Sequence, residues 1–83
     1  MRIIAELPHP DCKITIFNMN QKYIVKLEQG PLEQSYKISE LDLAGGGVND
    51  VFEIIDDAFI QEALQHFSQM RLTFHNAYKR NNF

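Results

Sequence analysis

Three side chains near the start of the chain, His9, Asp11 and Cys12, are of the types that bind metal ions or support nucleophilic catalysis. Both uses require the groups to converge on an accessible site, and a nucleophilic cysteine must also be available as a thiolate. The strand pattern described below places Cys12 on the apolar face of a sheet, where a thiol is inert. We therefore expect this cluster to be structural.

The other groups that could support chemistry also fit structural roles. His66 and His75 stand on different sides of a predicted helix, so they do not form a metal site. The glycine-rich segment 44–50 lacks the lysine of a phosphate-binding loop, and Asp50 would repel an anion there. The acid pair at 56–57 fits a helix cap. We expect a protein that is not an enzyme and that has no metal site and no cofactor.

Composition sets the broad class of the protein. The chain has 83 residues, enough for one domain, and its 45% hydrophobic and 23% charged residues are typical of a globular protein. A single cysteine excludes an intrachain disulfide and favours a reducing compartment. The N-terminus has no apolar run of the length that a signal peptide or a membrane helix needs, so we expect a cytoplasmic protein without membrane contact. The net charge of −3 disfavours a general nucleic-acid binder.

Four short runs rich in β-branched and aromatic residues predict four strands joined by even-numbered loops. The strands are expected at about 2–7, 12–18, 21–28 and 33–38, with loops at 8–11, 19–20 and 29–32. Because alternate residues of a strand point to opposite faces, such loops keep the apolar residues on one face. The predicted pairs are Leu7 with Cys12, Ala5 with Ile14, Ile3 with Ile16, Ile16 with Tyr23, Ile14 with Val25, Cys12 with Leu27, Val25 with Tyr36, and Tyr23 with Ile38.

The second half of the chain has helical periodicity. Asp50 and Glu53 have the spacing of a capping box, and Asp56 or Asp57 can cap a second helix. The two helices are expected at about 49–56 and 57–80. The longer one carries an apolar stripe formed by Ile60, Ala63, Leu64, Phe67, Phe74 and Tyr78. The sequence thus predicts a single α+β domain, residues 1–83, in which a four-stranded antiparallel meander sheet is followed by a short helix and a long C-terminal helix packed on one face of the sheet.

The same registers predict the composition of the opposite, outer face of the sheet. An apolar row is expected from Ile4, Thr15 and Ile24, next to Phe17. The cations around this row are Arg2, Lys13, Lys22, Lys26 and Lys37. Lys13 and Lys26 are predicted to lie opposite each other, an unfavourable pair. Either this face is solvated, or the short helix covers it with Val51, Phe52 and Ile55, or it contacts a partner.

The long helix is also longer than the sheet that it covers. At 1.5 Å per residue it spans about 36 Å, whereas the four strands form a sheet of roughly 15 by 20 Å. Phe74 and Tyr78 continue the apolar stripe beyond the sheet, and Arg71 interrupts it. Either the last turns fray or a second copy covers them, and we expect a second copy because most soluble oligomers are symmetric homodimers. Arg71 then meets an acid of that copy or lies at an exposed edge of the stripe.

These patterns support two functional hypotheses of different classes. The first is a non-catalytic interaction module that forms a homodimer or binds another protein; a regulatory or inhibitory protein acting through its acidic helical half is a variant of it. Its candidate contact residues are Ile4, Phe17, Ile24, Arg71, Phe74 and Tyr78. The alternative is a single-stranded nucleic-acid-binding protein, since aromatics and cations together bind such strands. Its candidate contact residues are Arg2, Lys13, Phe17, Lys22, Lys26 and Lys37.

Overall fold

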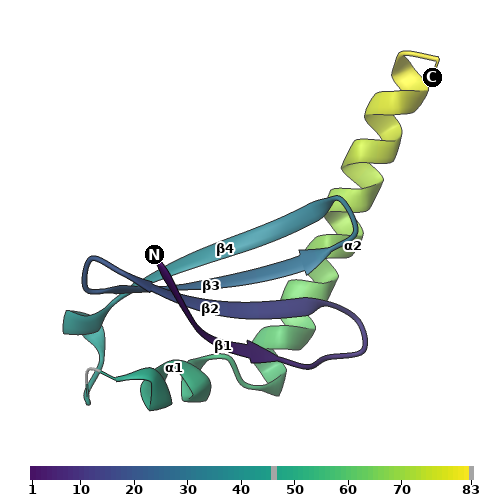
Figure 1. Ribbon diagram of the computed structural model, residues 1–83. Helices are drawn as coiled ribbons and strands as arrows, with labels where there is room; N and C mark the ends of the chain where they lie inside the picture. The colour runs from purple at the N-terminus through teal and green to yellow at the C-terminus, as the bar shows by residue number, and fades with distance from the viewer. Residues whose placement is uncertain (46, 83) are drawn as a thin grey trace.

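A computed structural model describes residues 1–45 and 47–82 of the chain, so one of the three consecutive glycines, Gly46, lies outside the described residues. One antiparallel sheet in the order β1-β2-β3-β4 is followed by a 3-10 turn and two helices (Figure 1). The elements are β1 (Arg2–Leu7), β2 (Lys13–Met19), β3 (Lys22–Gln29), β4 (Leu32–Ser39), η1 (Glu40–Asp42), α1 (Val48–Ile54) and α2 (Asp57–Arg80). The predicted α+β meander is confirmed, and η1 is an addition that the sequence pattern did not indicate.

The turn between β2 and β3 lies one residue later than predicted. Asn20 and Gln21 form a two-residue turn with φ angles of 52° and 63°, as a hairpin of this length requires. Ile16 therefore pairs with Val25 rather than with Tyr23. This shift of the pairing by two residues leaves the same residues on the same face, because the side-chain period of a strand is two.

The pairing of β3 with β4 is the predicted one. Val25 lies opposite Tyr36, and Tyr23 lies opposite Ile38. The strands extend further than expected, so the connection is the two residues 30–31 instead of four. Gly30 has a φ of 58°, a left-handed conformation that glycine adopts without steric cost.

The predicted pairing of β1 with β2 was wrong by two residues. Ala5 lies opposite Ile16 rather than Ile14. The reason is the loop after β1, whose prolines Pro8 and Pro10 have no N–H to donate to a strand ladder. Pairing therefore starts again only beyond Cys12, and the loop is longer than the predicted 8–11.

The prediction that Ile4 lies on the outer face of the sheet was also wrong, because β1 has a bulge at this residue. The register shifts by one residue between Ile3 and Ala5, which reverses the alternation at the N-terminal end of the strand. Ile4 consequently packs against the core and does not belong to the outer face. Ile3 takes that place opposite Phe17, with 58% of its surface exposed.

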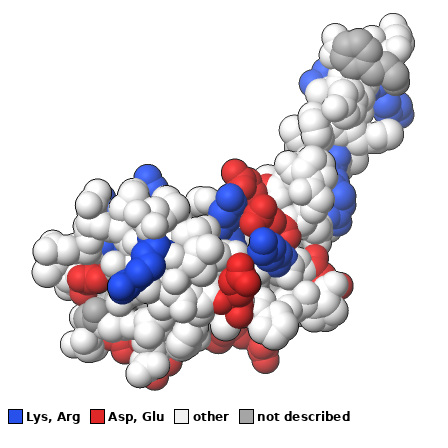
Figure 2. Space-filling view, viewed as in Figure 1, with Lys and Arg blue, Asp and Glu red and all other residues white. Residues whose placement is uncertain are grey.

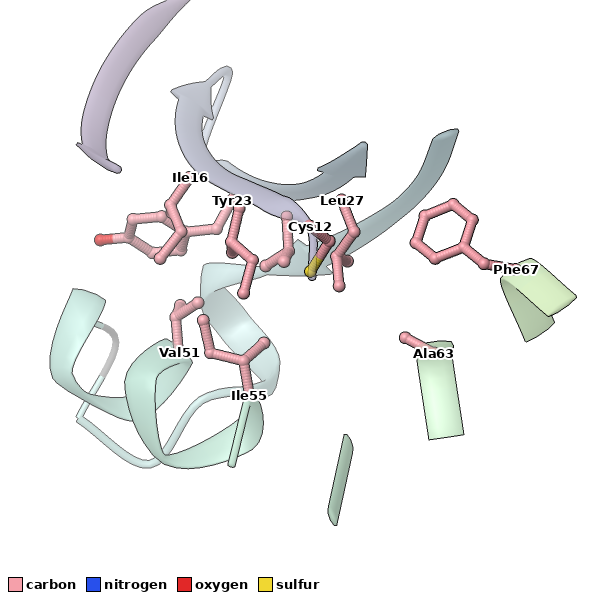
Figure 3. Packing of buried hydrophobic residues seen from close by; sticks show 10 residues of the cluster. Cys12, Ile16, Tyr23, Leu27, Val51, Ile55, Ala63 and Phe67 are labelled. Atoms are coloured by element: carbon pink, nitrogen blue, oxygen red, sulfur yellow. The ribbon is translucent and has the colours of Figure 1, made fainter. Parts of the chain in front are cut away.

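The core lies between the inner face of the sheet and the two helices (Figure 3). Its buried residues are Cys12, Ile14, Ile16, Tyr23, Val25, Leu27, Val51, Ile55, Ala63 and Phe67. Val51 and Ile55 place α1 on this inner side, so the short helix does not cover the outer face. Phe52, which was expected to contribute to such a cover, is exposed.

A polar side chain on the inner face fixes α2 against β4. The Gln34 amide nitrogen donates to the Ala63 carbonyl oxygen over 2.8 Å, and the Gln34 amide oxygen accepts the Tyr36 hydroxyl over 2.5 Å. The Tyr36 ring packs edge-on against Phe59, with 5.0 Å between the ring centroids. Buried polar groups are tolerated when they are hydrogen-bonded, so this contact restricts how α2 can slide along the sheet.

The helix caps agree with the sequence in one case and differ in the other. Asp56 caps α2 as predicted, since its carboxylate accepts the Phe59 N–H over 2.9 Å. The predicted capping box of α1 was wrong. That helix begins at Val48, so Asp50 lies inside the first turn and accepts the Gly45 N–H over 2.6 Å.

We predict that Gln34→Ala destabilises the fold by about 1–2 kcal/mol, because it removes two partly buried hydrogen bonds and leaves the Tyr36 hydroxyl without its acceptor. Gln61→Ala is the matched control on an exposed position of α2 and should change the free energy of unfolding by less than about 0.5 kcal/mol. Urea unfolding followed by circular dichroism measures both. Equal midpoints for Gln34→Ala and the unchanged chain would show that Gln34 does not anchor α2.

Candidate functional site

The cluster of possible catalytic groups near the N-terminus has a structural geometry. The His9 Nδ1 atom accepts the Asp11 N–H over 3.1 Å, which stabilises the loop. Cys12 is buried, and burial together with the Asp11 charge raises the pKa of its thiol above the ordinary value of 9.0. In residues 1–45 and 47–82 we find no group of three or more His, Cys, Asp or Glu side chains that could hold a metal ion.

The apolar row on the outer face of the sheet is largely covered by its own neighbours. Thr15 and Ile24 are only 3% and 8% exposed, and Phe17 is half-buried. A shallow groove of about 280 Å³ runs beside them, lined by Met1, Phe17, Met19, Ile24, Lys26, Glu33, Ser35 and Lys37. The apolar surface that remains exposed on this face is at its edge, at Met1 and Ile3, which are 73% and 58% exposed.

The charges on the outer face are mixed rather than cationic. Lys13 lies opposite Glu28, not opposite Lys26 as predicted. The Lys26 ammonium forms an ion pair of 3.2 Å with Glu33, and the hydrogen bond to Glu33 and the charges of Glu28 and Glu33 raise the pKa of Lys26. Glu6 adds a further acid opposite Thr15. Lysines and glutamates thus alternate here, and Figure 2 shows blue and red atoms side by side over the sheet.

Two other members of the predicted cationic set are at the margins of this face. Arg2 lies opposite Asn18, beyond the bulge. It therefore belongs to the face of the strand opposite to that of Ile3 and Phe17. Lys22 lies next to the β2–β3 turn, whereas Lys37 lies opposite Ile24. The structure therefore brings Lys26 and Lys37 to the groove that Phe17 lines. Lys13 lies at the other end of β2, opposite Glu28, and Arg2 is not brought to this face.

Arg71 marks the point at which α2 leaves the sheet. Its guanidinium is exposed and donates to the Gln29 side chain and, over 3.2 Å, to the Ser68 hydroxyl. Gln29 in turn donates to the Asp11 carbonyl oxygen over 2.8 Å. These bonds tie the helix to the end of β3 and to the loop after β1. Arg71 thus lies at an exposed edge of the stripe, one of the two positions expected for it.

Beyond this point α2 projects away from the rest of the molecule (Figure 1). An open groove of about 490 Å³, here called the α2 groove, is lined by Leu32, His66, Gln69, Met70, Thr73, Phe74 and Ala77. Phe74 and Tyr78 expose 42% and 47% of their surfaces, and their rings contact each other with centroids 4.8 Å apart. The structure thus brings these two predicted residues together on a surface that the chain's own sheet does not cover.

Charge is divided along the second half of the chain. Seven acids and no lysine or arginine lie between Lys37 and Arg71; they are Glu40, Asp42, Asp50, Glu53, Asp56, Asp57 and Glu62. After Glu62 the sequence contains no acid, and Arg71, Lys79 and Arg80 are its cations. On the face shown in Figure 2, the projecting end of α2 carries blue atoms and no red ones.

Sequence reasoning identified the stripe residues but missed most of the α2 groove. His66, Gln69, Thr73 and Ala77 recur at intervals of three and four, which is the helical signal that could have shown them as one face. Three of the four are polar and the fourth is small, so a search for large apolar residues passes over them. Leu32 reaches the groove from β4, and that juxtaposition depends on the tertiary fold.

We predict that the Cys12 thiol reacts slowly with iodoacetamide at pH 7.5, at least tenfold more slowly than in urea-unfolded chain, because burial and Asp11 keep it protonated. A thiol whose pKa is raised by folding stabilises the folded state below its unfolded pKa and loses that contribution as the pH rises through the folded pKa. The free energy of unfolding should therefore fall above pH 9.0 more steeply for the unchanged chain than for Cys12→Ala. Equal alkylation rates in folded and unfolded chain would contradict this.

Comparison of the chain with protein-family models, curated proteins and solved structures finds no match. Within the described residues, no helix combines the length and the apolar character needed to cross a membrane.

Proposed function

We propose that this chain is a non-enzymatic interaction module that forms a homodimer through the projecting part of α2, residues 70–80. The observation that carries the proposal is that Phe74 lies at the α2 groove with 42% of its surface exposed. A folded monomer gains little from an aromatic side chain at that position. A partner that covers it gains both its area and that of Met70 and Ala77 beside it.

Covering Phe74 contributes a definite part of the energy of such a contact. An aromatic side chain has roughly 200 Å² of surface. Covering the exposed part of Phe74 would remove about 80 Å² from water and contribute about 2 kcal/mol. In a two-fold symmetric dimer this contribution occurs twice, because each copy covers the same residue of the other.

The sequence of the projecting part of α2 gives it little intrinsic stability as a helix. It contains Thr73, His75 and Asn76, which have low helix propensity, and no acid that could form an ion pair one turn away from Arg71 or Lys79. An isolated helix of about ten residues is marginal in water. The contact of Phe74 with the next aromatic ring adds only about 0.2–0.5 kcal/mol. Packing against a second copy supplies what the segment lacks.

The outer face of the sheet is the weaker candidate for association. Ile24 is 8% exposed, so covering it removes little apolar surface from water. The glutamates among its lysines, Glu28 and Glu33 in particular, also weaken the case for single-stranded nucleic acid, since such binding depends on a continuous positive groove. The projecting helix is therefore the surface on which we place the function.

We predict that the unchanged chain sediments with twice the monomer mass of 9.7 kDa at high micromolar concentration. Phe74→Ser should weaken the dimer by more than about tenfold, since the lost apolar area is worth about 2 kcal/mol per copy. Leu41→Ser is the matched control, because Leu41 is 90% exposed and lies in η1, away from α2. It should leave the dissociation constant unchanged.

Sedimentation equilibrium of the three proteins decides between the outcomes. A chain that stays at monomer mass at 500 µM would contradict the proposal. So would a Leu41→Ser variant that loses association to the same degree as Phe74→Ser, because general stickiness of exposed apolar residues would then explain the dimer.

A further inference from the structure

The division of charge on α2 is only partly explained by the helix itself. Acids near the N-terminus and cations near the C-terminus of a helix complement its dipole, but this effect falls off within the first and last turns. Asp57, Lys79 and Arg80 lie in those turns. Glu62 and Arg71 lie outside those turns. The helix dipole therefore does not explain their charges, nor the complete absence of acids after Glu62.

Glu62 and Arg80 lie on one face of α2. They are 18 residues apart, which is five turns of 3.6 residues, or about 27 Å along the helix axis. His66 and Thr73 lie between them on nearly the same face, and both line the α2 groove. This face thus begins with an acid, continues along the groove and ends with a cation.

Resting on the proposed homodimer, we infer that the two copies pair with their α2 helices antiparallel, each seated along the α2 groove of the other. The Arg80 end of each helix then lies beside Glu62 of the second copy. A surface with an acid at one end and a cation at the other is complementary to itself under a two-fold rotation that reverses the helix. Two Glu62–Arg80 pairs form, one at each end of the contact.

A parallel arrangement is disfavoured by both charge and shape. It would bring the two Arg80 side chains together at one end of the contact and the two Glu62 side chains together at the other, and like charges at an interface select against that pairing. It would also place both sheets at the same end of the paired helices, whereas each helix projects from its sheet in one direction (Figure 1). The antiparallel arrangement puts the two sheets at opposite ends.

The orientation can be tested by cross-linking on the full chain in a Cys12→Ser background. His66→Cys and Asn76→Cys are exposed positions at equal distances along the helix axis from the level of residue 71, which is halfway between Glu62 and Arg80. In the antiparallel pair they meet each other, whereas two copies of the same variant hold their cysteines about 15 Å apart. A disulfide requires Cα atoms within about 7 Å. We expect a cross-linked product from the mixture of the two variants and little from either variant alone.

Charge reversal gives a second readout that differs between the two orientations. Arg80→Glu places like charges beside Glu62 in the antiparallel pair, so the dissociation constant at low salt should rise about fivefold, and Glu62→Arg combined with Arg80→Glu should restore it. In a parallel pair, Arg80→Glu would replace two facing cations by two facing acids and leave the dissociation constant unchanged.

The outcomes separate this inference from the proposed function. Dimer mass with cross-linking in each variant alone, or with no cross-link in the mixture, overturns the antiparallel pairing and leaves the homodimer intact. A dissociation constant of Arg80→Glu that is unchanged or lower also overturns it. Monomer mass for the unchanged chain overturns the homodimer itself and the pairing with it.

Discussion

The one-sided core holds every other element of this protein in place. Phe67 and Ala63 of α2 are buried together with Ile16, Val25 and Leu27 of the inner sheet face. In a domain of this size the core is thin, so these few contacts determine the position of the helix. The hydrogen bond from Gln34 to Ala63 then fixes the helix along its axis. Since an α-helix advances in one direction, the residues after 70 have to leave the sheet.

This constraint gives the molecule two uncovered surfaces of different kinds. On the outer face of the sheet, Thr15 and Ile24 are buried, and lysines lie beside glutamates. The exposed apolar side chain of that face, Ile3, lies on the edge strand β1. The projecting helix has no second layer, and Phe74 lies exposed at a groove that two elements of the chain form but do not fill. The molecule measures 50 by 25 by 20 Å, and the projecting helix accounts for its elongated shape (Figure 1).

Much of the fold follows from local patterns in the sequence. Period-two alternation predicts the inner face, and a two-residue shift in register leaves that face unchanged, which is why Ile16 is buried although its partner differs from the predicted one. The Asp56 cap depends on neighbouring residues and was predicted for the same reason. The stripe through Phe74 follows from helical spacing alone.

The features that could not be predicted from the sequence depend on contacts between distant residues or on small differences in energy. A bulge such as the one at Ile4 adds one residue without changing residue types, so alternation alone does not indicate it. Gln34 is polar yet lies on the inner face, because its partner Ala63 is distant in the sequence. The α2 groove depends on Leu32 approaching the helix from β4, which only the folded chain brings about.

Hydrogen exchange of the backbone amides in residues 71–80, measured at several protein concentrations, tests the central claim most directly. If a second copy stabilises this segment, its protection rises as the concentration passes the dissociation constant, while the amides of β2 and β3 stay unchanged. Protection of residues 71–80 that is the same at 1 µM and at 500 µM would show that the projecting helix needs no partner.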